Sequence, residues 1–242
     1  MTWKNWPMND EVHWPRNEGV VGVLGVAPLA TADFCLKLAN RPAKKDWNHV
    51  RVLVDSNPKI PSRGRCLELG ETDPTPFLAA GIANLAANGA TVVAVPCNTA
   101  HIFYDGYTRD APVYVPHIVD VACKKAQSLG IKKVLLLASR SVVKYNLYAD
   151  RFKDHDMDVV SFPDQELVSH TIEMVKQNKH DAALTLSLRK KIESLKGFEA
   201  VILGCTEISL VIPEEKERVI IDSNKELADF CVSYAQGEAQ KL

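Results

Sequence analysis

The sequence predicts an α/β protein with two similar lobes, each built on a mostly parallel sheet flanked by helices. Three observations support this fold class. After residue 18, short β-branched runs alternate with longer segments of helical period, and the second half of the chain repeats this alternation. One expected strand in each half ends in a similar cysteine-containing pattern. Such alternation is typical of βαβ units, whose parallel strands are covered by helices.

In the first half, three apolar runs are expected as strands, and a segment of helical period follows each of them. The expected strands are 20–26 (VVGVLGV), 50–55 (VRVLVD) and 91–96 (TVVAVP), and the expected helical segments are 29–41, 76–89 and 98–107. The strands are nearly continuous apolar runs, which indicates that both faces of the sheet are buried.

The second half repeats this scheme. The expected strands are 132–139, 158–162, 198–205 and 217–222, and the expected helices are 118–130, 141–152, 164–195 and a last one from about 224. No low-complexity linker divides the halves. Residues 1–18, with three tryptophans and two prolines, do not fit the alternation and are interpreted as an N-terminal extension.

Composition narrows the function classes. The chain has 242 residues, of which 46% are hydrophobic, which is enough to bury a core. Lys plus Arg (29) nearly cancel Asp plus Glu (30), so no nucleic-acid or membrane partner is expected. No apolar run approaches the roughly 18 to 20 residues of a membrane span, and the N-terminus lacks a signal-peptide layout. We therefore expect a cytoplasmic protein whose six cysteines, which show no C-x-x-C spacing, are free thiols.

Two of these cysteines stand out because they follow expected strands in matching contexts. The segments TVVAVPCNTA (91–100) and EAVILGCTEI (199–208) both run from an apolar strand through Pro or Gly into Cys and then into hydroxyl or amide groups. Ligands of open α/β sheets bind at the carboxyl ends of strands, and the N-terminus of a following helix favours an anion. Cys97 and Cys205 are therefore expected where a thiol pKa is lowered and a carboxylate docks. The remaining cysteines are interpreted as small buried hydrophobic residues: Cys35, Cys66, Cys123 and Cys231.

Two thiols on opposite sides of a cleft suit one kind of chemistry. One thiolate takes a proton from one face of a tetrahedral carbon, and the other thiol returns a proton to the opposite face. Backbone N–H groups stabilise the neighbouring carboxylate as it gains enediolate character. The expected reaction is stereoinversion.

By its CNTAH (97–101) and GCTE (204–207) motifs, the sequence resembles the aspartate/glutamate racemase family, the cofactor-independent amino-acid racemases with two catalytic cysteines. The resemblance runs from about Gly19 to the C-terminus. It implies racemisation of an amino acid, most simply aspartate or glutamate, with Cys97 and Cys205 as the two bases. It also implies a homodimer that binds a small-molecule amino acid and uses no metal, pyridoxal phosphate or nucleotide.

The resemblance assigns roles to further residues. Asn98, Thr99 and Thr206 are expected to bind the α-carboxylate. Arg63, in the Pro-rich loop NPKIPSRGR (57–65), falls at the family's arginine near the substrate, where a guanidinium would hold a side-chain carboxylate in a bidentate pair.

A lysine about thirty residues before the second cysteine recurs in some aspartate racemases, and Lys176 is the nearest match. Lys179 is a second candidate, and a solvated helix end is the alternative interpretation.

The segment PLAT, from Pro28 to Thr31, resembles the family's first loop and helix start. The loop itself departs from the family. Where a glycine-glycine-methionine-glycine run usually precedes the proline, this chain has LGVAP (24–28), one residue shorter and with Ala27 in place of a glycine. Because this loop lines the site in the family, we expect the change to affect substrate preference.

Two supporting residues have two interpretations each. Glu207 either orients Thr206 or a cysteine, or favours a helix N-terminus. His101 either bonds within the site or is a core histidine. Cys97 and His101 are four residues apart, a spacing that suits a metal, but no second cluster accompanies them and zinc is not expected.

A nucleotide site is not expected either. Gly22 and Gly25 follow a strand-like run as in a dinucleotide fingerprint, but the third glycine is absent and no P-loop pattern is present.

The prediction is thus a pair of lobes related by a pseudo-twofold axis, with the active site between them. The first lobe covers 19–115 and is completed by a C-terminal helix, 223–242, and the second covers 116–222. Two other function classes stay open. One is a related cysteine-dependent decarboxylase or isomerase of a small dicarboxylate, and the other is a non-catalytic amino-acid-binding homologue.

Overall fold

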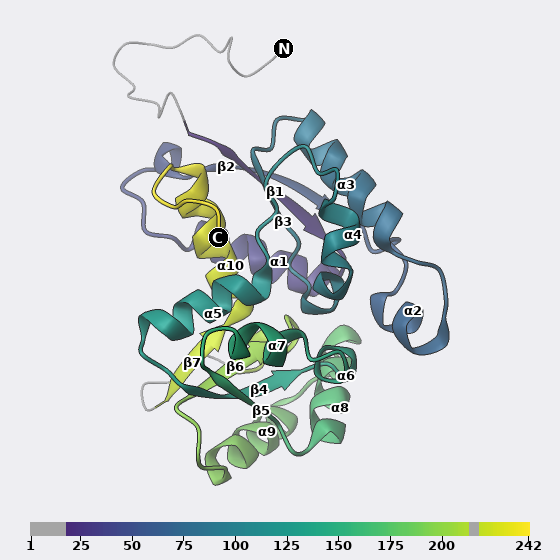
Figure 1. Ribbon diagram of the computed structural model, residues 1–242, viewed down its shortest axis with the longest axis vertical. Helices are drawn as coiled ribbons and strands as arrows, with labels where there is room; N and C mark the ends of the chain where they lie inside the picture. The colour runs from purple at the N-terminus through teal and green to yellow at the C-terminus, as the bar shows by residue number, and fades with distance from the viewer. Residues whose placement is uncertain (1–17, 213–217) are drawn as a thin grey trace.

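The structure is a computed structural model that describes residues 18–212 and 218–242. Its described part contains two parallel sheets, one from each half of the chain, flanked by helices as the sequence predicts (Figure 1). Of the predicted N-terminal extension, all residues except Glu18 lie outside the described ranges.

The first sheet has three parallel strands in the order β2-β1-β3. They are β1 (Val20–Gly25), β2 (Arg51–Ser56) and β3 (Val92–Ala94). Every residue of the central strand β1 is buried, whereas the residues of β2 are half-buried or exposed. The expectation that both faces of all strands are buried is therefore wrong for the edge strand β2, whereas the other edge strand, β3, is fully buried and contacts helix α10 (Ser223–Ala235). It is also wrong for β5 (Asp158–Ser161), an edge strand of the second sheet.

The second sheet has four parallel strands in the order β5-β4-β6-β7. They are β4 (Lys133–Ala138), β5 (Asp158–Ser161), β6 (Ala200–Gly204) and β7 (Val219–Asp222). The register pairs Ala138 with Gly204, so β4 and β6 end side by side. Because β6 is fully buried in the centre of the sheet, Cys205, the residue that follows it, is still buried at the carboxyl end of the strand.

Helices connect the strands in the order that βαβ units require. They are α1 (Pro28–Ala39), α2 (Arg63–Leu69), α3 (Thr75–Ala87), α4 (Tyr104–Thr108), α5 (Ile118–Ser128), α6 (Arg140–Lys144), α7 (Leu147–Lys153), α8 (Gln165–Lys176), α9 (Ala182–Ser194) and α10 (Ser223–Ala235), with short 3₁₀ helices η2 (Asp46–Asn48), η3 (Asn98–Phe103) and η4 (Ile208–Leu210).

Four expectations about helices are wrong. The segment expected as one helix, 98–107, is the 3₁₀ helix η3 followed by α4. The expected helix 141–152 is two helices, α6 and α7, because Asn146 between them has a left-handed backbone (φ 52°). The expected helix 164–195 is likewise split into α8 and α9, and Asn178 between them has φ 54°. The Pro-rich segment, expected as a loop, enters helix α2, whose N-cap Ser62 accepts a hydrogen bond from the backbone N–H of Arg65.

The core has three layers. The middle layer joins the facing sides of the two sheets through α5 and α10, which lie between them (Figure 1). One outer layer packs α8 and α9 on the second sheet, and the other packs α3 on the first. Helix α10 contacts α1, β1 and β3 as well as β6 and β7, so the end of the chain ties the two sheets together. The lobe boundaries at 115/116 and 222/223 stay predictions.

Candidate active site

The two cysteines that the sequence singles out line one cavity of about 380 Å³. Cys205 directly follows β6 and is 7% exposed, whereas Cys97 comes three residues after β3 and is half-buried. Each thiol therefore reaches the cavity from a different sheet. Asn98, Thr99 and Thr206 also line this cavity.

Neither cysteine is followed by an α-helix, and this part of the expectation is wrong. Cys97 precedes η3, in which the backbone N–H of Ala100 donates to the Cys97 carbonyl at 3.0 Å. The same carbonyl accepts a hydrogen bond from His101 Nδ1 at 3.0 Å. Cys205 is followed by a turn and then η4.

Glu207 is the centre of the polar contacts around the second thiol. Its Oε2 accepts hydrogen bonds from Cys205 Sγ at 3.1 Å and from Thr206 Oγ1 at 3.3 Å, and its Oε1 lies 3.7 Å from Lys176 Nζ. Of the two interpretations of Glu207, the structure supports the one in which it orients both a cysteine and Thr206.

Burial raises the pKa of the Cys205 thiol well above its ordinary value, and the negative charge of Glu207 and the hydrogen bond to it raise it further. The expectation that the strand end lowers this thiol's pKa is therefore wrong for Cys205. A buried thiol beside a carboxylate is held in its protonated form.

Lys176 belongs to the site although it ends helix α8. Its side chain is 58% exposed, lines the cavity and pairs with Glu207. Burial is the largest single influence on the pKa of Lys176 and lowers it, but the negative charges of Glu207 and of the two cysteines together outweigh burial. The net pKa is raised, so the ammonium stays charged. The other candidate, Lys179, is absent from the cavity wall.

Arg63, at the first turn of α2, also lines this cavity, as does Arg140 of α6. Its Nη1 donates to the backbone carbonyls of Ile60 at 3.4 Å and Pro61 at 3.2 Å. Its Nε is buried and has no hydrogen-bond partner in the described part of the chain. This guanidinium therefore has donor capacity left for a ligand.

Asn98 is held from two sides. Its Nδ2 donates to Ser223 Oγ at 3.1 Å, and its Oδ1 accepts from the Tyr148 hydroxyl at 2.6 Å. Since Oδ1 is occupied, the second hydrogen of Nδ2 is the part of this amide that remains for a ligand. Thr99 Oγ1 lies at hydrogen-bond distance, 3.0 Å, from Ser139 Oγ, and both residues line the cavity.

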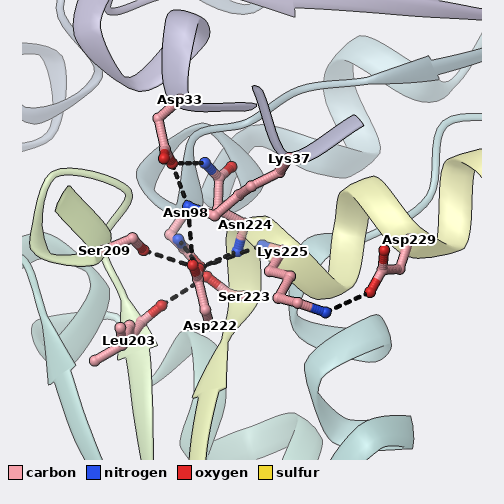
Figure 2. A network of polar contacts seen from close by, with 10 residues as sticks. All are labelled: Asp33, Lys37, Asn98, Leu203, Ser209, Asp222, Ser223, Asn224, Lys225 and Asp229. Carbon is pink, nitrogen blue, oxygen red and sulfur yellow. Dashed lines mark hydrogen bonds and ion pairs between the residues drawn. The ribbon is translucent and has the colours of Figure 1, made fainter. Parts of the chain in front are cut away.

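A polar network beneath the cavity fixes these positions (Figure 2). Ser223 Oγ, which accepts from Asn98, donates to the carbonyl of Leu203 at 2.7 Å. Asp222 accepts from Ser209 Oγ at 2.8 Å and pairs with Lys37 at 2.9 Å. Helix α1, the start of α10 and the segments after both cysteines are thus connected.

Sequence reasoning missed several cavity residues, among them Ser139, Ser141 and Glu68. Ser139 follows Ala138, which pairs with Gly204 in the sheet, so Ser139 lies beside Cys205. The strand-end rule, applied to the run 132–139, would have found it. Glu68 accepts a hydrogen bond from Ser141 Oγ at 3.1 Å, and no sequence signal pointed to it.

The predicted supporting residues fall into two groups. Pro28 lines a second cavity that adjoins the first. Thr31 lines neither cavity, and its Oγ1 donates to the carbonyl of Ala27 at 2.7 Å, which holds the loop before α1.

His101 is buried, and burial lowers its pKa to about 4, so it is neutral at pH 7. Its ring packs edge-on against that of His117, with centroids 4.8 Å apart. Both interpretations of His101 hold in part, because it is a core histidine that also anchors the carbonyl of Cys97.

Among residues 18–212 and 218–242, no three His, Cys, Asp or Glu side chains are grouped so that they could hold a metal ion. None of the helices in these ranges is long and apolar enough to cross a membrane.

Fold and site together define an α/β protein in which two sheets each contribute one thiol to a small polar cavity. A family model described as Asp/Glu/Hydantoin racemase matches residues 23–231, and the chain belongs to this family. The resemblance seen in the two cysteine motifs is thereby confirmed.

Named relatives are consistent with this family. The chain is 26% identical over 227 residues to a broad specificity amino-acid racemase, RacX, of Bacillus subtilis, a match that covers 88% of this chain and 97% of the relative. Amino-acid racemases are isomerases, the class of enzyme that the sequence predicts.

Solved structures agree on the fold. The aspartate racemase of Picrophilus torridus is similar with a TM-score of 0.80 and 28% identity, over 92% of this chain and 96% of that one. A glutamate racemase isoform of Bacillus anthracis is similar with a TM-score of 0.63 and 18% identity, over 92% of this chain and 84% of the other. The second likeness concerns the fold alone.

Proposed function

We propose that this protein is an amino-acid racemase that inverts the α-carbon by proton transfer between two thiols, Cys97 and Cys205, without a cofactor. The observation that carries the proposal is that both thiols, which follow strands of different sheets, line one cavity of about 380 Å³. The family and the racemase relative from Bacillus subtilis support the same reaction class.

The reaction needs one base and one acid on opposite faces of the substrate. The thiolate of one cysteine takes the α-hydrogen as a proton and becomes a thiol, and the electron pair left on the α-carbon is delocalised into the carboxylate. The thiol of the other cysteine then donates its proton to the opposite face and becomes a thiolate. No proton is gained or lost overall, and the configuration is inverted.

The surroundings of Cys205 suit the donor role. It is buried, it carries its proton in a hydrogen bond to Glu207, and its pKa is raised. In the direction that starts from a protonated Cys205, Cys97 acts as the base. Glu207 positions the donor, and Lys176 balances the charge of Glu207.

Substrate binding is assigned to the polar wall of the cavity. Thr99, Thr206 and the free amide hydrogen of Asn98 are proposed to hold the α-carboxylate. Arg63, whose Nε lacks a partner in the described residues, is proposed to hold the side-chain acid of aspartate or glutamate, together with Lys176. The aspartate racemase from Picrophilus torridus supports an acidic substrate.

We also propose a homodimer, as the family resemblance implies, with each chain divided into the lobes 19–115 plus 223–242 and 116–222. Light scattering tests the dimer, because a particle of about twice the 26.8 kDa chain mass is expected.

The reaction is tested by proton NMR of L-aspartate and L-glutamate incubated with the purified protein in D₂O without added cofactor, followed by chiral chromatography. Loss of the α-proton signal together with appearance of the D-enantiomer is the expected result. A decarboxylase or dicarboxylate isomerase would convert its substrate into another compound, and a binding protein would be stabilised by ligand without proton exchange.

A further inference from the structure

A second cavity of about 360 Å³ adjoins the active site. We call its apolar wall the apolar annex. It is formed by Val26, which precedes α1, by Pro28 and Leu29 in the first turn of α1, and by Pro58 and Ile60 in the segment before α2. Val26 and Ile60 are buried, and Leu29 is 40% exposed at the rim. The annex therefore offers a largely apolar surface beside a polar site.

The two cavities meet at a shared wall. Ala27, Ser62, Arg63, Lys176 and Glu207 line both of them. A substrate that lies between the thiols thus has the annex within reach of its side chain, past the two cations. The two cavities adjoin in the structure without any rearrangement of the described residues.

The charges of the shared wall are already partly satisfied. Lys176 Nζ lies 3.7 Å from Glu207 Oε1, and Arg63 Nη1 donates to two backbone carbonyls. A substrate side chain that ends at this wall binds more tightly when it carries a carboxylate, because Arg63 and Lys176 are cations. A longer side chain continues past it to Val26, Leu29 and Ile60, whose side chains offer apolar contacts and no hydrogen bond.

We propose that the apolar annex binds the side chain of the substrate, so that the enzyme takes amino acids with long apolar side chains, such as norleucine and methionine, besides acidic ones. A long side chain is needed because the annex begins at the wall that both cavities share, which includes Arg63, Lys176 and Glu207. This inference rests on the proposed racemase function and adds a substrate class to it. It also gives the altered LGVAP loop a role, since Val26 to Pro28 belong to that loop and line the annex.

The experiment compares L-norleucine with L-aspartate in the wild type and in Leu29→Asp, which places a carboxylate at the rim of the annex. Adding or removing one methylene in an apolar pocket changes kcat/KM by about tenfold or more. We therefore expect wild type to racemise norleucine and the norleucine-to-aspartate ratio of kcat/KM to fall at least about tenfold in Leu29→Asp. The variant Leu29→Met keeps an apolar side chain at this position, so its norleucine-to-aspartate ratio of kcat/KM is expected to equal that of wild type.

The matched control is Leu36→Asp, which makes the same change in the same helix at a residue that is 62% exposed and lies outside both cavities of the site. Its ratio is expected to equal that of wild type. Equal melting temperatures of the two aspartate variants show that the effect is not one of folding.

Failure of this inference differs from failure of the racemase proposal. Turnover of aspartate or glutamate without turnover of norleucine overturns the annex alone, and so does an unchanged ratio in Leu29→Asp. Calorimetric binding of norleucine tests the annex without turnover, since a Kd that is the same in wild type and Leu29→Asp overturns it and one about tenfold weaker supports it.

Discussion

Replacing Glu207 by Gln tests how the second thiol is controlled. The change keeps the shape of the side chain and removes the negative charge that accepts the Cys205 Sγ–H bond at 3.1 Å. A hydrogen bond to a charged group contributes about 1.5 to 3 kcal/mol. Because a thiol is a weak donor, we take the lower end of that range, which corresponds to about a tenfold loss in kcat.

The same substitution changes the acidity of the thiol in a predictable direction. The charge of Glu207 raises the pKa of Cys205, so its removal lets the thiolate form at lower pH. The assay is the rate of iodoacetamide alkylation of Cys205 against pH, followed by mass spectrometry of the peptide that contains it. We expect the alkylation profile of Glu207→Gln to shift toward lower pH, which a purely structural role would not produce.

Glu173→Gln is the matched control for this measurement. Glu173 lines the same cavity, but it accepts a hydrogen bond from Gln177 and is not among the charges that act on Cys205. Its alkylation profile is expected to coincide with that of wild type. If Glu207→Gln also coincides with wild type, Glu207 does not control the thiol and the reasoning is refuted.

Three further predictions concern stability. Tyr148→Phe leaves the buried Asn98 Oδ1 without its donor and is expected to lower the free energy of unfolding in urea by about 1 to 3 kcal/mol, whereas an unchanged value would contradict the network. Gly25→Ala puts a Cβ 2.1 Å from Thr31 Oγ1 and is expected to cost about 1 to 3 kcal/mol, of which adding Thr31→Ala recovers part; no recovery would mean that the clash is not the cause. Finally, burial lowers the pKa of His101 to about 4 in the folded protein, whereas the unfolded chain keeps a value of about 6.5. As the pH falls from about 6.5 to about 4, the unfolded chain binds a proton that the folded protein does not, so the free energy of unfolding decreases over this range. The loss is about 3 kcal/mol between pH 7 and pH 4, and urea unfolding at both pH values should show a smaller difference in His101→Gln.

The strand-end rule accounts for what could be predicted about the site. Parallel strands bring their carboxyl ends to one edge, so Cys97 and Cys205 were found from the residues that precede them. The same rule would have found Ser139, whose position beside Cys205 follows from the pairing of Ala138 with Gly204. Glu68 reaches the cavity through the packing of α2 on α6, a contact between segments more than seventy residues apart that no local pattern encodes.

The errors have physical causes of the same kind. A lowered pKa was expected for Cys205 from its place after a strand, but burial and the Glu207 carboxylate two residues on act in the opposite direction. Helix breaks at Asn146 and Asn178 depend on a left-handed backbone that asparagine tolerates but does not require. The periodicity around them is helical on both sides, so the sequence alone favoured one helix in each case.

The central claim is that both thiols take part in the proton transfer, and one measurement tests it most directly. The rate of racemisation of the better acidic substrate is measured by chiral chromatography for wild type, Cys97→Ser and Cys205→Ser, with circular dichroism as the control for folding. A positioned acid or base contributes about 10² to 10⁴ in rate, so each variant is expected to lose racemisation by at least about a hundredfold while it keeps its fold. Normal turnover by either folded variant would contradict the two-thiol mechanism.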